Sequence, residues 1–285
     1  MISKNKGFLS FEFLYPFAAL VFAITSVWML YTTVITPRAD ELILRRDVLS
    51  RQGGANVESV VHERPLVLII KDFEPGCEIV FCFWGMLVLA YKFYQIFRER
   101  RLLSQDFIRL QAGERIIPDD ALDRYKELKA TVDQRPAWRE RLLPECLLAS
   151  LHRFHATSSI NDASVAVRER AELAADHLDS SLGLVRYIAW AIPAIGFIGT
   201  VRGIGQSLDN VEQAIHGDIS PVTRNLGLAF NSTFVGLMLC IVLMYVLHTV
   251  QERQESFIIE AQTYCRDKLI DMMKVPTKEE SNTFT

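Results

Sequence analysis

Two neighbouring hydrophobic stretches of the chain carry polar side chains that would lie inside a membrane. The first contains Thr200, and the second places Asn231, Ser232 and Thr233 about two turns inside its hydrophobic part. Polar groups in hydrocarbon need hydrogen-bond partners. Each hydroxyl can bond back to a carbonyl one turn earlier in its own helix, or Thr200 and Thr233 can line a hydrated lumen that conducts an ion. The spacing alone leaves both interpretations open.

The same two stretches are rich in glycine. Gly199 and Gly203 form a G-x-x-x-G pattern, and Gly196 continues the small-residue face. Lipid provides little hydrophobic drive for helices to associate, so small residues that let backbones approach mark packing faces. We therefore expect close helix packing at Gly196, Gly199, Gly203, Gly205 and Gly236.

Composition places these stretches in an integral membrane protein. Half of the 285 residues are hydrophobic, and the mean hydropathy is +0.16. A spanning helix needs roughly 20 mainly apolar residues, and four stretches meet that requirement. The first and the last contain no Asp, Glu, Lys or Arg, between Glu12 and Arg38 and between Arg224 and Glu252. The sequence therefore predicts an all-α, polytopic membrane protein with about four transmembrane helices.

The middle two stretches carry charged residues, which we place at their ends or inside protein. Glu78 and Lys92 lie near the ends of the second stretch, where long side chains can snorkel to the headgroups. Arg202 in the third stretch requires a membrane face or a protein interior. It can face an acidic loop residue such as Asp209 at the outer rim, or snorkel. We expect no ionisable residue in the central part of any span.

Basic residues set the expected orientation. They flank the start of the first span and the end of the second, which predicts that both chain ends are cytoplasmic. The resulting segments are a cytoplasmic N-terminus (1–12), spans at 13–36, 77–97, 186–208 and 226–250, outer segments at 37–76 and 209–225, a cytoplasmic helical domain (98–185) and a cytoplasmic C-terminal helix and tail (251–285).

The segments between the spans are expected to be mostly helical. Residues 38–52 have helical spacing that Gly53 and Gly54 end, while residues 65–70 form either a strand or a membrane-skimming piece. In the cytoplasmic domain, Pro118 with its two following acids opens one helix. Pro136 opens another helix, which Pro144 kinks.

Two of the predicted helices extend beyond the membrane. The helical period continues without a breaker from Asn161 into the third span, so the two are expected to form one helix. The fourth span continues in the same way through residues 251–274. Two such extensions imply a helical bundle outside the membrane.

Other classes of function lack their residues. The five cysteines are scattered, without the C-x-x-C spacing of a zinc or redox site, and a net charge of −3 argues against a nucleic-acid surface. His152 and His155 are three residues apart, but two histidines without a third ligand are more typical of a surface than of a metal site. We find no nucleophile–base pair, metal cluster or phosphate loop of an enzyme.

The polar and glycine-rich stretches resemble the MotA/TolQ/ExbB proton channel family. Gly199-Thr-Val-Arg-Gly-Ile204 is similar to the G-T-V-x-G-I signature of TolQ and ExbB, and Ala229-Phe-Asn-Ser-Thr-Phe-Val-Gly-Leu237 is similar to their A-L-x-x-T-A-x-G-L. Ala191-Ile-Pro-Ala-Ile-Gly196 resembles the M-P-A-L-G stretch of MotA. The resemblance covers about residues 169–255. The motifs lean towards TolQ and ExbB, whereas four spans are closer to MotA.

The resemblance implies a ring-forming subunit of an ion-driven motor. Five copies of the chain would surround a dimer of a one-span, MotB/TolR/ExbD-like partner whose span carries an essential Asp. Thr200, Thr233, Ser232 and Asn231 would form the ion pathway and meet that carboxylate, with Pro193 as the helix hinge. The implied setting is the bacterial inner membrane and its lipids, with no cofactor beyond the transported H⁺ or Na⁺.

A second reading makes the chain a passive scaffold. The glycines would then only pack helices, and the long helices would recruit cytoplasmic partners. The sequence identifies neither the ion nor the task, which in this family includes flagellar rotation, outer-membrane energisation, surface motility and phage defence.

Overall fold

The computed structural model describes residues 6–52, 66–108, 114–139 and 141–275, and every named element in these ranges is helical. Four helices are long and apolar enough to cross a membrane, at Leu14–Arg45, Phe73–Leu103, Ile160–Asp209 and Ser220–Met272. The predicted all-α, four-helix membrane fold is therefore confirmed.

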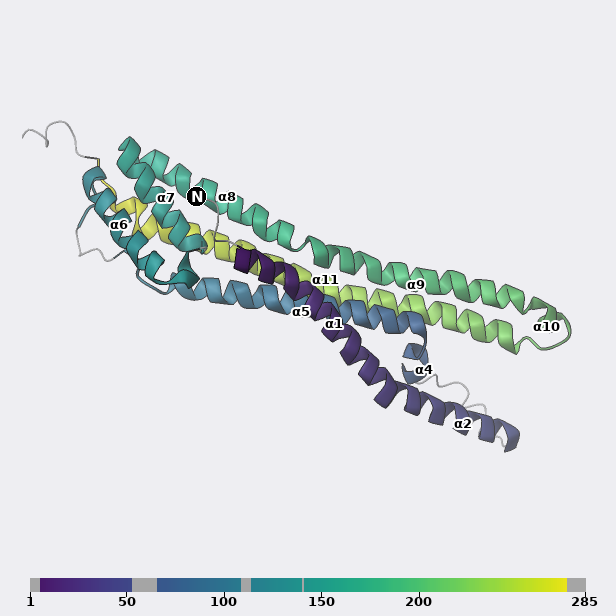
Figure 1. The fold of residues 1–285 in the computed structure, drawn as a ribbon. Helices are drawn as coiled ribbons and strands as arrows, with labels where there is room; N and C mark the ends of the chain where they lie inside the picture. The colour runs from purple at the N-terminus through teal and green to yellow at the C-terminus, as the bar shows by residue number, and fades with distance from the viewer. Residues whose placement is uncertain (1–5, 53–65, 109–113, 140, 276–285) are drawn as a thin grey trace, which may run out of the picture. The chain divides into compact units, whose positions relative to one another are not determined.

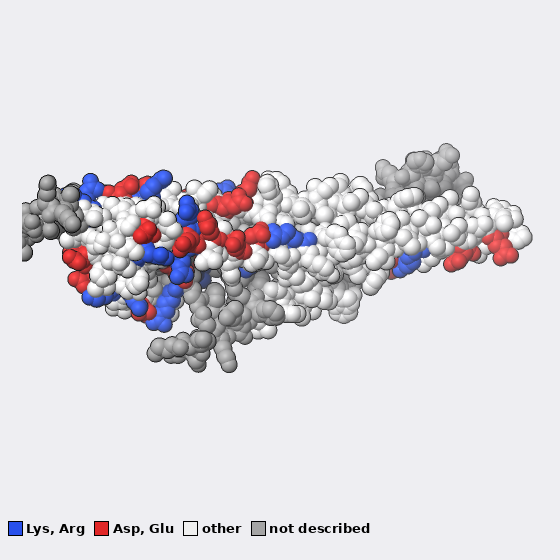
Figure 2. All heavy atoms as spheres, turned by 90° about the horizontal axis from the view of Figure 1, so that it is seen from above, with Lys and Arg blue, Asp and Glu red and all other residues white. Residues whose placement is uncertain are grey.

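The chain forms two compact units. One contains residues 1–91 and 184–248, and we call it the membrane unit; the other contains residues 92–183 and 249–285, and we call it the second unit. On the face drawn in Figure 2, side chains of both charges crowd the surface of the second unit, whereas much of the membrane unit is free of them. The candidate polar residues all belong to the membrane unit.

The first span is a run of three helical segments. Helix α1 (Lys6–Leu30) passes into a π-helical turn, η1 (Tyr31–Ile35), and then into α2 (Thr36–Gln52). Pro37 has no amide hydrogen to donate, and the wider π turn ends two residues before it. The helix predicted for residues 38–52 is found as α2, and its proposed stop at Gly53 and Gly54 lies outside the described residues.

Helix α5 (Phe73–Leu103) packs against α1 (Figure 1). The hydroxyl of Tyr15 donates to the carbonyl of Leu87 at 3.0 Å, and the indole of Trp84 donates to the carbonyl of Pro16 at 2.8 Å. The segment before α5 forms a short helix, α4 (Leu66–Ile70), so the strand considered for residues 65–70 is not found. Helix α5 begins at Phe73, which places Glu74 in its first turn and Glu78 in its second.

Helices α9 (Gly183–Asp209) and α11 (Ser220–Lys268) lie side by side in the membrane unit (Figure 1). A short helix, α10 (Val211–Ile215), lies in the connection between them. The single helix expected from Asn161 onward is interrupted by a turn at Leu182, which separates α8 (Ile160–Ser181) from α9. Helix α8 begins one residue after Ser159, whose hydroxyl accepts from the amide of Asp162.

The second unit contains α6 (Pro118–Gln134), a 3-10 turn, η2 (Pro136–Trp138), α7 (Leu142–Thr157), α8, a second 3-10 turn, η3 (Ile270–Met272), and the ends of α5 and α11. Pro118 opens α6 as predicted. Pro136 opens only the 3-10 turn, and Pro144 lies in the first turn of α7, where its missing amide hydrogen is tolerated. The predicted kink at Pro144 is therefore wrong.

Candidate functional site

The hydroxyls of Thr200 and Thr233 meet at the interface of α9 and α11. They are hydrogen-bonded to each other. Thr200 Oγ1 lies 3.2 Å from the carbonyl oxygen of Gly196 and 3.1 Å from that of Ala229, and Thr233 Oγ1 lies 3.0 Å from the oxygen of Gly196. Back-bonding within one helix and contacts between helices therefore occur together, and both threonines stay half-buried.

Pro193 interrupts the hydrogen-bond ladder of α9 just before this threonine pair. Its ring nitrogen cannot donate to the carbonyl of Ala189, four residues earlier. The thiol of Cys240 on α11 donates to that carbonyl instead, at 3.2 Å. The helix thus continues through a half-buried proline with one backbone bond replaced by a side-chain bond from its neighbour.

Four of the five glycines assigned to packing lie where an added Cβ would meet close neighbours. A Cβ at Gly203 would lie 2.6 Å from the Cβ of Ala229, and one at Gly199 would lie 2.4 Å from Ser232 Oγ. A Cβ at Gly196 would lie 3.0 Å from the backbone of Thr233, while one at Gly236 would lie 3.1 Å from Glu78. At Gly205 no atom lies within 4 Å of that position.

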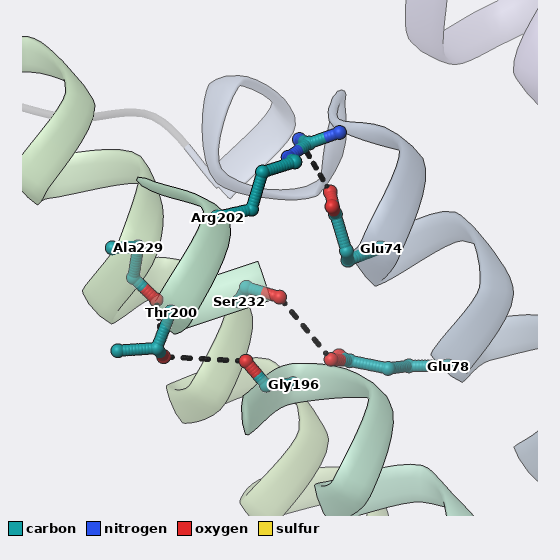
Figure 3. Close-up of polar contacts among 7 residues, drawn as sticks. All are labelled: Glu74, Glu78, Gly196, Thr200, Arg202, Ala229 and Ser232. Carbon is teal, nitrogen blue, oxygen red and sulfur yellow. Dashed lines mark hydrogen bonds and ion pairs between the residues drawn. The ribbon is translucent and has the colours of Figure 1, made fainter. Parts of the chain in front are cut away.

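Glu78 of α5 is buried against this glycine-rich face and does not snorkel. The residue is 0 % exposed, and Ser232 Oγ donates to its Oε1 at 3.4 Å (Figure 3). Its other oxygen, Oε2, is buried without a hydrogen-bond partner in the described part of the chain. The expectation that Glu78 reaches the headgroups is therefore wrong, because close packing of α5 on α9 and α11 encloses its side chain.

Arg202 pairs with a residue that the sequence did not suggest. Its Nη2 lies 2.8 Å from the carboxylate of Glu74, which is 6 % exposed, so its acidic partner within the chain is Glu74 and not Asp209 (Figure 3). The Arg202 side chain itself is half exposed. Glu74 and Glu78 are four residues apart on α5, so they share one face of the helix.

The remaining candidate residues surround this cluster. Ser232 is buried, and Asn231 is half-buried on α11 one residue earlier. We refer to Glu78, Ser232, Thr200 and Thr233, with the carbonyl of Gly196, as the polar cluster of the membrane unit. It brings a carboxyl, three hydroxyls and a backbone carbonyl within a few ångströms of one another, which are groups that can hold and pass a proton.

The outer faces of the same helices are apolar. Large hydrophobic side chains are exposed on α9 and on α11, including Trp190, Phe197, Ile198, Phe234 and Ile241. Contiguous apolar surface of this kind marks contact with lipid or with another protein. The membrane unit therefore buries its polar cluster while it presents apolar side chains outward.

The histidine pair of the second unit has ordinary protein partners. His155 Nδ1 lies 2.9 Å from the carbonyl oxygen of Pro118, and the ring of His152 lies 5.6 Å from that of Tyr125. No group of three or more metal-ligating side chains occurs among the described residues. All five cysteines are free thiols.

The helices that carry the polar cluster fall within a known family region. Residues 139–263 match the model of the MotA/TolQ/ExbB proton channel family. This region of the chain is similar to that family. The resemblance expected from the motifs is confirmed, and the matched range extends beyond residues 169–255 to include α7 and all of α8. No curated protein and no solved structure matches the chain.

The four candidate spans indicate a multi-pass membrane protein, and the matched region is similar to subunits of the proton channel family. The matched region contains Thr200, Ser232, Thr233, Pro193 and the packing glycines. Helix α5, with Glu74 and Glu78, lies outside it. The structure therefore places two carboxyls of α5, which lies outside the match, beside the polar residues of the matched region.

Sequence reasoning missed the two carboxyls for an identifiable reason. It judged Glu78 by its distance from the end of a hydrophobic stretch, without regard to which face of the helix it occupies. The available signal was the spacing of Glu74 and Glu78, since two acids four apart on a spanning helix must share a face and need protein on that face.

Proposed function

We propose that the chain is the ring subunit of a motor driven by an ion-motive force. Five copies surround a dimer of a one-span partner whose span carries an Asp, and ion flow alternately protonates that Asp. The changing contacts between the Asp and the ring drive rotation or force. The complex lies in the bacterial inner membrane with both ends of this chain on the cytoplasmic side.

The threonine pair carries this proposal. Thr200 and Thr233 come from consecutive spans of the family region and are hydrogen-bonded to each other, yet each stays half-buried. Two hydroxyls with remaining exposure offer donors and acceptors to a carboxyl that approaches from outside the chain. A packing role alone would be served by apolar residues of the same size.

The apolar outer faces of α9 and α11 support assembly into a ring. Neighbouring copies and lipid would cover residues such as Phe197 and Phe234, which the single chain leaves exposed. Pro193 supports movement, because one backbone bond of α9 is already replaced by the Cys240 contact. Each elementary charge that crosses 100 mV supplies about 2.3 kcal/mol, which suffices to bias such a step.

The test is proton uptake into vesicles that contain the chain and its partner. We expect wild-type chain with partner to take up protons, and Thr200→Val with Thr233→Val to lose that uptake, because valine keeps the size and removes the hydroxyl. Thr25→Val is the matched control: in the described part of the chain, the hydroxyl of this exposed α1 threonine donates only to carbonyls of its own helix. If the double variant takes up protons at the wild-type rate, the two hydroxyls are not on the ion path and the scaffold reading is favoured.

A further inference from the structure

Glu78 combines complete burial with an incomplete set of partners. Its residue is 0 % exposed, Oε1 accepts from Ser232, and Oε2 is buried without a hydrogen bond in the described part of the chain. No Lys or Arg of that part forms an ion pair with it. A buried carboxylate without a compensating cation is costly, and an added proton removes its charge.

The surroundings of Glu78 are shaped around the carboxyl group. A Cβ at Gly196 would lie 2.9 Å from Oε1, and a Cβ at Gly236 would lie 3.1 Å from the same atom. A Cβ at Gly199 would lie 3.1 Å from the Cγ of Glu74. Three glycines of α9 and α11 therefore provide the space that α5 needs to insert its two acids.

The carboxyl lies next to the threonine pair. Gly196 touches both groups. Its carbonyl oxygen accepts from Thr233 at 3.0 Å, and its α-carbon borders Glu78. Ser232, which donates to Glu78, directly precedes Thr233 on α11. Gly196 on α9 and Ser232 on α11 therefore lie between the Glu78 carboxyl and the threonine pair, which is the proposed contact with the partner.

Among the described residues, the groups that face Glu78 include no cation paired with it. On its own helix these are Glu74 and Cys77, and on the π-helical turn of the first span it is Tyr31. Helix α9 contributes Gly196, and α11 contributes Ser232 and Gly236, none of which titrates. The nearby cation, Arg202, is paired with Glu74.

We propose that Glu78 is a proton-binding site of this chain, held by Ser232 beside the Thr200–Thr233 pair, and that it exchanges its proton with the ion pathway. This inference rests on the proposed function, since it adds an ionisable group of the ring to the Asp of the partner. The chain therefore contributes more than hydroxyls to the path. Its ligand is a proton, bound by an acid that α5, α9 and α11 enclose.

Carbodiimide labelling tests the site without a partner. Dicyclohexylcarbodiimide adds to protonated carboxyls in apolar surroundings, and the carboxyl oxygen and its proton are both retained in the adduct. The full chain in native membranes is labelled over a series of pH values and analysed by peptide mass spectrometry. We expect an adduct on Glu78 that declines as pH rises, and none on Glu74, whose carboxylate forms an ion pair with Arg202.

Two labelling results would overturn the proposal. The first is a Glu78 peptide that carries no adduct at any pH while other membrane carboxyls react. The second is suppression of the adduct by Na⁺ at constant pH, which would assign the site to Na⁺ binding. Glu78→Gln removes the reactive group and identifies the adduct by position.

Proton uptake with the partner separates this inference from the proposed function. Glu78→Gln is expected to lower uptake about a hundredfold, the lower range for a positioned proton-transferring group, while Glu78→Asp retains part of it. Glutamine keeps the shape of glutamate, so the variant is expected to fold, and gel filtration checks this. Wild-type uptake with an equally active Glu78→Gln variant would overturn this inference alone, whereas no wild-type uptake would contradict the proposed function and leave the labelling test standing.

Discussion

Glu78 and Glu99 lie on the same helix, α5, and both are largely removed from water, but their partners differ in charge. Glu99, in the second unit, pairs with the guanidinium of Arg141 at 2.6 Å, and both side chains are less than one-fifth exposed. Glu78, in the membrane unit, is hydrogen-bonded among the described residues only to the neutral hydroxyl of Ser232. The charge of a buried carboxylate beside a cation is offset within the ion pair. One with a hydroxyl can gain and lose a proton without breaking an ion pair.

The largest effect on stability is expected where the paired carboxylate loses its cation. Arg141→Ala leaves the carboxylate of Glu99 buried and uncompensated, which should lower the free energy of unfolding by about 3 kcal/mol. Arg139→Ala is the control, since Arg139 and its partner Asp133 are both more than half exposed and the pair should contribute less than about 1 kcal/mol. Unfolding in mixed SDS micelles measures both. Equal losses would show that Glu99 does not depend on Arg141.

A smaller loss is expected when the enclosure of Glu78 is filled. At Gly196 an added methyl group would lie 2.9 Å from the carboxyl oxygen and 3.0 Å from the backbone of Thr233. Gly196→Ala should therefore cost about 2 kcal/mol, as overpacking does elsewhere. Gly205→Ala, in open space on the same helix, should leave stability unchanged or raise it slightly. If both variants unfold alike, the helices are not packed as described.

The hydroxyl partner should contribute less still. Ser232→Ala removes the one hydrogen bond found to Glu78 in the described residues and should cost about 1 kcal/mol. Ser256 is a matched serine in the second unit: it donates to Glu260 at 3.2 Å, but Glu260 also pairs with Arg100. Ser256→Ala should therefore cost less than Ser232→Ala. The reverse order in the same micelle assay would contradict the assigned role of Ser232.

The smallest change in stability is expected for Glu78→Gln. The amide keeps the shape of the side chain and can accept from Ser232, so the free energy of unfolding should change by less than about 0.5 kcal/mol. This variant separates stability from function, because its proton uptake should fall sharply. A destabilisation as large as that of Arg141→Ala would mean that the charge of Glu78 supports the fold.

The sequence predicts the spans because hydrophobic length is a local property. The charge-free run before Arg38 and the glycine and threonine motifs of α9 and α11 can each be recognised within one segment. The same is true of Pro118, whose fixed backbone angle and following acids suit the start of α6. These predictions required no knowledge of which helices are neighbours.

What the sequence does not reveal depends on contacts between distant segments. Arg202 and Glu74 are separated by 128 positions, and Ser232 and Glu78 by 154. The interruption at Leu182 was missed as well, since a one-residue turn before Gly183 leaves the helical period of the sequence almost intact. Pro144 was misplaced because a helix start at Leu142 was not recognised.

The proposed function requires that α9 and α11 present Thr200 and Thr233 to a partner that carries the essential acid. A cryo-electron microscopy structure of the complex purified with its one-span partner tests this directly. We expect several copies of the chain around an axial space, with the threonine pair of each copy facing the partner's helix. Threonine pairs turned towards lipid, or copies packed without space for a helix between them, would contradict the account.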